Sequence, residues 1–123
     1  IIRCIISVKK GVRKGRAVMV FNTGAALLDA VVLAVVSGEA EGTYGYKITQ
    51  DVRNVMDVSE STLYPVLRRL LKDGCLTSED RQFDGRNRRY YKITDKGREK
   101  LGIYKEEWRI YSSKINAIFL GGI

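Results

Sequence analysis

Apolar and polar residues recur at helical spacing between Ser59 and Gly74, a stretch that reads SESTLYPVLRRLLKDG. Its apolar residues, which share one face of an α-helix through their three- and four-residue intervals, are Leu63, Val66, Leu67, Leu70 and Leu71. The opposite face begins with small polar residues and then becomes basic; it carries Ser61, Thr62, Tyr64, Pro65, Arg68, Arg69 and Lys72. Ser59 or Ser61 is expected to cap this helix, because a serine oxygen accepts a backbone N–H of the first turn. The helix is expected to end at Gly74.

This pattern is typical of a helix that enters a DNA major groove, where polar residues near its N-terminus reach base edges and arginines contact phosphates. An ordinary amphipathic helix with a solvated basic face has the same pattern. Pro65 lacks a backbone N–H and is best tolerated in the first turn of a helix. The choice between Ser59 and Ser61 as the cap therefore stays open.

Two further helices are expected before this one. The residues from Gly24 to Ser37 are apolar except for Asp29 and the two ends, so this helix must be covered on more than one side. A buried strand is the alternative, but the length favours a helix. A second helix, capped by Thr43, is expected from Tyr44 to about Met56. Its apolar face consists of Ile48, Val52, Val55 and Met56. The short connection to the Ser59 helix makes the pair a helix-turn-helix.

After Gly74 the pattern changes to that of a β-hairpin, with strands from Leu76 to Phe83 and from Arg88 to Thr94. Asp84-Gly85 between them is a favoured two-residue turn. The cations near the turn, against the single acid Asp84, are Arg81, Arg86, Arg88, Arg89 and Lys92. A basic hairpin beside a helix-turn-helix is typical of a wing that contacts phosphates or a minor groove. The alternative is a basic hairpin edge that resists aggregation.

A last helix is expected from Asp95 to about Phe119, with Thr94 as its cap. Its apolar residues alternate at three- and four-residue intervals and form a heptad seam; they are Leu101, Tyr104, Trp108, Tyr111, Ile115 and Ile118. The seam, together with Leu27 and Val31 of the first apolar helix, predicts a twofold homodimer. Packing of both helices within one protomer is the alternative.

Composition excludes several classes of site. The chain of 123 residues fits a single domain, and it contains no histidine. Cys4 and Cys75 match no metal-ligand spacing and predict no disulfide, so the chain is expected in a reducing cytoplasm. No apolar run is long enough to span a membrane. The sequence has no metal-ligand cluster and no phosphate-binding glycine loop, so we expect neither a cofactor nor enzymatic activity.

The net charge of +8 is concentrated at one end. Residues 1–18 hold six bases and no acid, which leaves sixteen bases against fourteen acids, or +2, from Met19 onward. The prediction of DNA binding therefore depends on where the cations lie. We expect a basic, poorly ordered extension over residues 1–23, a winged helix-turn-helix over 24–94 and a dimerisation helix over 95–123.

Three segments in order, Tyr44–Ile48, Ser61–Gly74 and Arg88–Gly97, give the chain a resemblance to the PadR family of transcriptional regulators. The resemblance extends from Leu27 to Phe119 and implies an α+β winged helix-turn-helix homodimer that represses transcription from a pseudo-palindromic DNA site. It also implies DNA contacts from Ser61, Thr62, Tyr64 and Pro65 and from Arg86 and Arg88 of the wing.

The single long C-terminal helix resembles the shorter, second PadR subfamily. Some members of that subfamily control multidrug export and bind flat aromatic compounds between protomers. Trp108 matches the tryptophan of these relatives and is the candidate effector-binding residue. The competing hypothesis is a winged-helix protein-interaction module that does not bind DNA.

Overall fold

The computed structural model describes residues 24–121. The expected N-terminal extension, with Cys4 and its six cations, lies outside the described residues. No helix of the described range is long and apolar enough to cross a membrane.

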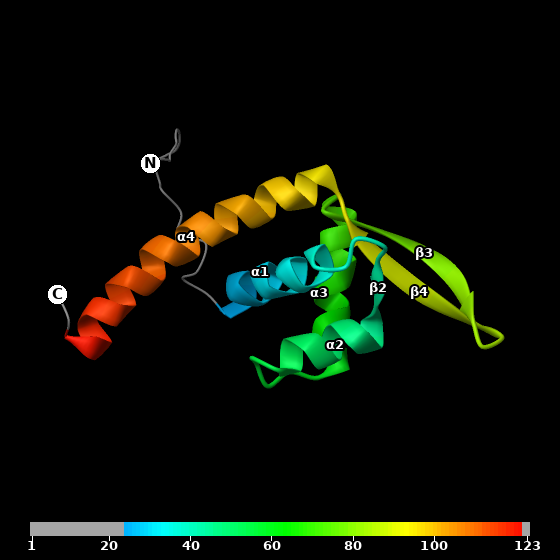
Figure 1. Ribbon diagram of the computed structural model, residues 1–123, viewed down its shortest axis with the longest axis horizontal. Helices are drawn as coiled ribbons and strands as arrows, with labels where there is room; N and C mark the ends of the chain where they lie inside the picture. Colours follow the sequence, from blue (N-terminus) through cyan, green and yellow to red (C-terminus); the bar gives the residue numbers. More distant parts are fainter. Residues whose placement is uncertain (1–23, 122–123) are drawn as a thin grey trace.

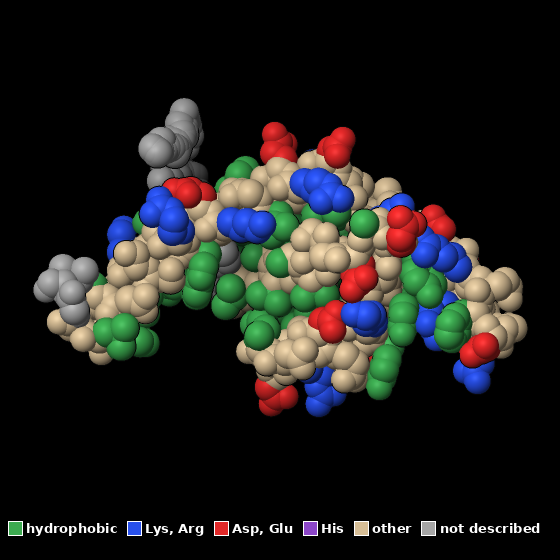
Figure 2. All heavy atoms as spheres, viewed as in Figure 1, with side chains coloured by type: hydrophobic (Ala, Val, Ile, Leu, Met, Phe, Trp, Pro, Cys, Tyr) green, Lys and Arg blue, Asp and Glu red, His purple; other side chains and the backbone are tan. Residues whose placement is uncertain are grey.

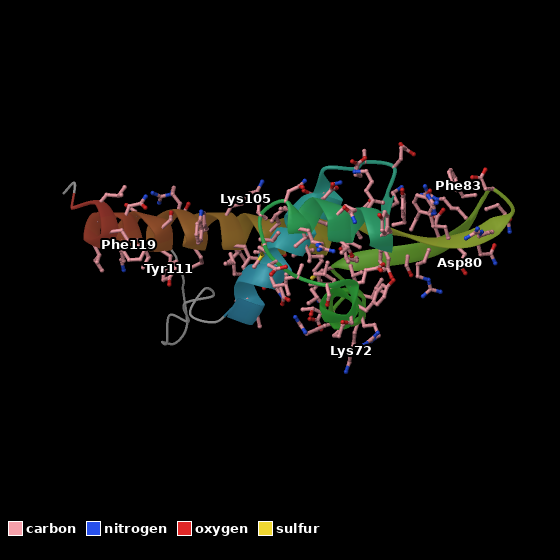
Figure 3. All side chains as sticks on the ribbon, turned by 90° about the horizontal axis from the view of Figure 1, so that it is seen from below. Lys72, Asp80, Phe83, Lys105, Tyr111 and Phe119 are labelled. Atoms are coloured by element: carbon pink, nitrogen blue, oxygen red, sulfur yellow. The ribbon has the colours of Figure 1, made fainter. Side chains whose placement is uncertain are left out.

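The described chain has an α+β fold (Figure 1). Its elements are α1 (Gly24–Ser37), β2 (Thr43–Tyr44), α2 (Gly45–Arg53), α3 (Glu60–Lys72), β3 (Leu76–Phe83), β4 (Arg86–Ile93) and α4 (Asp95–Leu120). The three strands form an antiparallel sheet in the order β2-β4-β3. Helix α4 and the β3–β4 hairpin extend from the helical body in opposite directions (Figures 1, 2 and 3). This arrangement confirms the expected winged helix with a long C-terminal helix.

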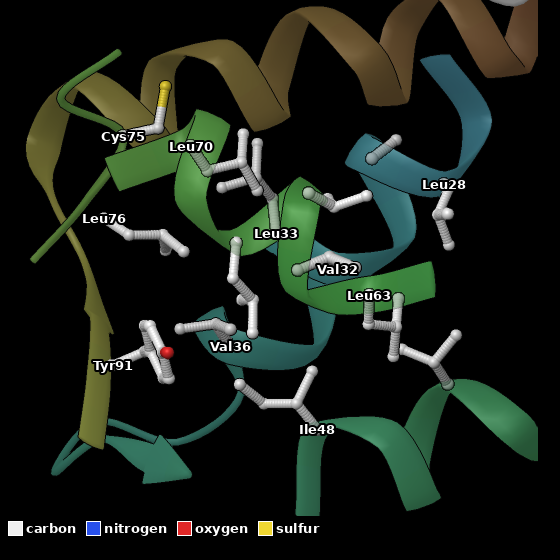
Figure 4. Close-up of a cluster of buried hydrophobic side chains, with 14 of the residues drawn as sticks. Leu28, Val32, Leu33, Val36, Ile48, Leu63, Leu70, Cys75, Leu76 and Tyr91 are labelled. Carbon is white, nitrogen blue, oxygen red and sulfur yellow. The ribbon is translucent and has the colours of Figure 1, made fainter. Parts of the chain in front are cut away.

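Helix α1 lies at the centre of the core, which explains why its sequence is apolar nearly all round. It packs against α2, α3, α4 and β4, and Val32, Leu33 and Val36 are fully buried. Side chains of α1, α3 and β4 converge in this core (Figure 4). The apolar face predicted for the Ser59 helix is also confirmed, since Leu63, Leu67 and Leu70 are at most 1% exposed.

Ser59 is the cap of α3, which decides between the two expected serines. Its Oγ accepts a hydrogen bond from the backbone N–H of Thr62 at 3.3 Å. Pro65 therefore lies in the second turn rather than the first. Pro65 gives no N–H to the Ser61 carbonyl, and both residues are exposed.

The start and end of α2 differ from the expectation. Thr43 does not cap the helix but pairs with Tyr91 in the short strand β2, and its side chain is buried. The helix ends at Arg53 instead of near Met56, which leaves Val55 72% exposed. A two-residue strand has too few positions for an alternating pattern, so the sequence did not reveal β2.

The hairpin and the final helix follow their local signals. Asp84 and Gly85 have φ angles of 51° and 76°, as a type I′ turn requires. Thr94 caps α4, because its Oγ1 accepts the Gly97 N–H at 3.0 Å, and its hydroxyl donates to the Gly74 carbonyl at 2.7 Å. These contacts fix the direction in which α4 leaves the sheet.

Candidate nucleic-acid interface

The start of α3 presents a group of exposed hydroxyls. Ser59 Oγ lies 2.9 Å from Ser61 Oγ and 3.2 Å from Thr62 Oγ1, and all three residues are exposed. The Tyr64 hydroxyl donates to Glu60 at 3.0 Å, and this bond raises the pKa of the phenol. Hydroxyl groups donate and accept hydrogen bonds, so this end of α3 is suited to base edges and phosphates.

The two arginines expected to hold phosphates are in different environments. Arg68 is exposed. The Arg69 guanidinium instead forms an ion pair with Asp29 of α1, whose side chain is only 11% exposed. Arg69 therefore connects α3 to α1. In the sequence, Asp29 was the only sign of this ion pair, because a lone acid in an otherwise apolar helix needs a partner when it is buried.

The tip of the hairpin is rich in cations of differing availability. Arg86 is exposed at the turn. Arg89 is 57% exposed in its side chain and donates to Asp80 across the strand pair at 3.2 Å. Arg88 is half-buried, and its guanidinium carbon lies 3.9 Å from the ring centres of both Tyr44 and Phe83. Basic and hydrophobic side chains accordingly lie next to each other over the hairpin in Figure 2.

Sequence reasoning missed the part that Arg81 plays in this region. Its Nη2 donates to the Glu41 carbonyl at 2.7 Å, and its guanidinium carbon lies 4.3 Å from the centre of the Tyr90 ring. Its Nε donates to Glu79 at 2.8 Å, which lowers the pKa of that carboxyl. Glu79 and Arg81 share a face of β3 through the alternation of the strand, whereas the pairing with β4 brings Tyr90 beside them and the chain before β2 supplies the Glu41 carbonyl.

The expected dimer seam is divided between two environments. Leu101 and Tyr104 are each 6% exposed and belong to the core of this chain, as does the half-buried Tyr111 at its margin. Leu101 and Tyr104 therefore pack within this chain, and their expected part in a dimer seam stays a prediction. Leu27 and Val31 of α1 also pack against the same core, half-buried.

The outer part of the seam is different. Trp108 is 46% exposed and Ile118 is 77% exposed, whereas Ile115 is half-buried. Phe119 and Leu120, beside Ile118, are 78% and 76% exposed. Hydrophobic side chains appear along the lower side of this half of α4 in Figure 2.

Within residues 24–121 the structure brings together no group of three or more acidic, cysteine or histidine side chains that could hold a metal ion. Cys75 is a buried free thiol.

Several known proteins are similar to this chain in sequence and in fold. The transcriptional regulator PadR-like family matches residues 32–103. A transcriptional regulator of Mycobacterium tuberculosis is 49% identical over 59 residues, which are 47% of this chain and 55% of that protein. The chain thus spans about half the length of this relative.

Solved structures match over more of the chain. A crystal structure of a protein from Streptococcus mutans has a TM-score of 0.74 and 38% identity, and the match covers 81% of this chain and 92% of that one. A PadR-like transcriptional regulator from Bacillus cereus has a TM-score of 0.68 and 32% identity, with coverage of 75% and 90%.

Proposed function

Because the chain belongs to the PadR-like family of transcriptional regulators, we propose that it binds duplex DNA as a homodimer and represses transcription from a pseudo-palindromic operator. Members of this family are regulators rather than enzymes. The observation that carries the proposal is the cluster of three exposed hydroxyl side chains at the start of α3, a helix whose other face is buried. Such a helix keeps its orientation while its polar end enters a major groove.

The roles of individual residues follow from their exposure. Ser61 and Thr62 reach base edges, with Tyr64 and Pro65 beside them on the same exposed surface of α3. Arg68 contacts a phosphate, and Arg86 and Arg89 at the hairpin tip contact the backbone or the minor groove. Arg69 supports α3 through Asp29.

Salt-dependent binding to duplex DNA tests this proposal. Operator candidates are first selected from a random duplex pool with the parent protein. Arg86→Ala and Arg89→Ala should each weaken binding across all sequences. Each should reduce the slope of log K against log salt by about 1.8, because the bound dimer loses two phosphate contacts. Ser61→Ala and Thr62→Val should instead change the preferred sequence.

Arg109→Ala is the matched control, because it removes one cation from α4, away from α3 and the hairpin. It should leave both affinity and slope close to those of the parent. A folded parent protein that shows no salt-dependent affinity for any duplex would favour the protein-interaction module instead.

Trp108 supports a finer proposal, which is release of DNA by a planar aromatic effector. The Trp108 ring is 46% exposed and lies 6.2 Å from the ring of Tyr111, centre to centre. In a dimer whose twofold axis passes near this level, two such aromatic surfaces face each other and can stack on a flat molecule. Release then requires that the effector bind the DNA-free arrangement more tightly.

Titration with planar cationic dyes tests the effector. The dyes should quench tryptophan fluorescence and, at the same concentrations, lower operator affinity. Calorimetry with Trp108→Ala, which lacks the fluorophore, should show weakened dye binding. Dye binding that leaves operator affinity unchanged would remove the regulatory role, and unweakened binding by the variant would remove the site.

A further inference from the structure

One face of the hairpin carries alternating cationic and aromatic side chains. The register pairs Arg81 with Arg88 and Phe83 with Arg86, so these side chains share the face of the sheet opposite to the buried Tyr91. Phe83 and Asp80 accordingly point to opposite sides of the hairpin in Figure 3. On β2, Tyr44 pairs with Tyr90 and extends the same face toward α2.

The Arg88 guanidinium is held between two rings. Its central carbon is 3.9 Å from the centre of the Tyr44 ring and 3.9 Å from the centre of the Phe83 ring. A planar guanidinium stacks on aromatic rings in a way that an ammonium group cannot, since it presents two flat, weakly hydrated surfaces. Tyr44 directly precedes α2 and Phe83 ends β3, so Arg88 bridges the helix-turn-helix and the hairpin.

Arg81 anchors the other end of the same row. It stacks on Tyr90, whose ring centre is 5.5 Å from that of Tyr44, and it donates to the Glu41 carbonyl at 2.7 Å. The chain passes close to it at Gly42, which has a φ of 101° and where an added Cβ would lie 3.2 Å from Arg81 Nη2. The backbone of the loop before β2 therefore approaches this arginine closely, as a glycine allows.

The two arginines of this row also repel each other. Like charges at directly opposite positions of an antiparallel pair destabilise a hairpin, and Arg81 is directly opposite Arg88. Arg88 has two aromatic partners, whereas Arg81 has one aromatic partner and the Glu41 carbonyl, and these contacts offset the repulsion between the two cations. An arginine that only contacts a phosphate in solvent needs no such stacking. We call the contacts of Arg81 and Arg88 with their aromatic partners the brace.

We infer that Arg88 and Arg81 are positioning residues, which hold the wing at a fixed orientation relative to α3 before DNA is bound. The effect on DNA binding rests on the proposed function. A wing that is already oriented loses less conformational entropy when the protein binds DNA. This assignment changes the role expected for Arg88, from a DNA contact to a support for Arg86 and Arg89.

Hydrogen exchange in the free, full-length protein tests the brace without DNA. Arg88→Lys keeps the charge and loses the planar stack. We expect amides of β3 and β4 to exchange about tenfold faster, the effect of losing one partly desolvated cation–π contact. Amides of α1 and α3 should be unchanged. Phe83→Leu removes one ring at an exposed position and should give a smaller effect in the same direction.

Arg86→Lys is the matched control, because Arg86 is a neighbouring exposed cation of the same strand. It should leave exchange unchanged. Parent-like exchange of the hairpin in Arg88→Lys, or equal acceleration in Arg86→Lys, would overturn the inference.

DNA binding supplies the second measurement. Arg88→Lys should weaken operator affinity about tenfold with the salt slope unchanged, since the number of cations is the same. Arg109→Lys, which exchanges the same two residue types on α4 away from the hairpin, should bind as the parent does. Full affinity in Arg88→Lys would identify a simple phosphate contact and overturn the positioning role. A parent that fails to bind DNA would refute the proposed function, while hydrogen exchange would still decide the brace.

Discussion

At Gly97 the lack of a side chain allows α4 to lie directly against Cys75, the residue before β3. A Cβ at this position would lie 2.2 Å from the Cys75 carbonyl oxygen and 2.7 Å from a side-chain carbon of Ile93. The Cys75 carbonyl also accepts the Thr94 N–H at 3.0 Å, so the backbone here cannot easily move away. Gly97 is therefore required by close packing and not by its φ angle.

Gly97→Ala should lower the free energy of unfolding by about 1–3 kcal/mol, because overpacking against backbone outweighs the better helix propensity of alanine. Urea unfolding measures the change. Gly102→Ala is the control in the same helix, where nothing lies within 4 Å of an added Cβ. That variant should be unchanged or up to about 1 kcal/mol more stable. Equal effects at the two positions would show that helix propensity decides both.

At the scale of elements, the Asp29–Arg69 pair sets how α3 rests on α1. The two residues are 40 positions apart, and the carboxylate is almost buried while the guanidinium is 45% exposed. Removing the arginine leaves a buried charge without its partner, which costs more than the pair itself contributes. The adjacent Arg68 is exposed and provides a comparison within the same helical turn.

Arg69→Ala should therefore destabilise the fold by about 1–3 kcal/mol, whereas Arg68→Ala should stay within about 0.5 kcal/mol of the parent. Thermal or urea unfolding of the two variants measures the difference. The double variant Asp29→Leu/Arg69→Met should recover most of the loss, because no charge is left buried. Equal destabilisation by the Arg68 and Arg69 variants would show that the Asp29–Arg69 ion pair does not contribute to stability.

At the scale of the whole molecule, α4 has one end in the core and the other carrying exposed apolar residues. Leu101 is 6% exposed, whereas Ile118, Phe119 and Leu120 are 76–78% exposed. Large hydrophobic side chains gathered on an exposed surface are typical of an interface. The proposed dimer buries this outer half of α4 against a second copy and places the two α3 helices about one DNA turn, roughly 34 Å, apart.

Ile115→Lys/Ile118→Lys should convert the dimer to a folded monomer, because two cations would enter the apolar interface. Sedimentation at micromolar concentration measures the assembly, and operator affinity should fall with it, since one half-site alone is then bound. Ser113→Lys, on the side of α4 away from the seam, is the control and should remain dimeric. A parent protein that sediments as a well-folded monomer would refute the dimer.

Local signals were sufficient for most of the elements. The cap at Thr94, the turn at Asp84-Gly85 and the apolar spacing of α3 predicted the bounds of their elements within one or two residues. The start of α3 needed the structure to choose Ser59 as its cap, and β2 was missed. Caps, turns and helical spacing act within a few residues, which is why periodicity detects them.

The sequence by itself determined the winged helix fold, the family and the surfaces that carry hydroxyls and cations. Only the tertiary structure decided which cations make contacts within the protein. Arg69 binds Asp29 and Arg81 binds Glu41, each across 40 positions, and the rings on Arg88 come from β2 and β3. It also assigned Leu101 and Tyr104 to the core of one chain. Partners of this kind are set by packing between elements, so no spacing along the chain encodes them.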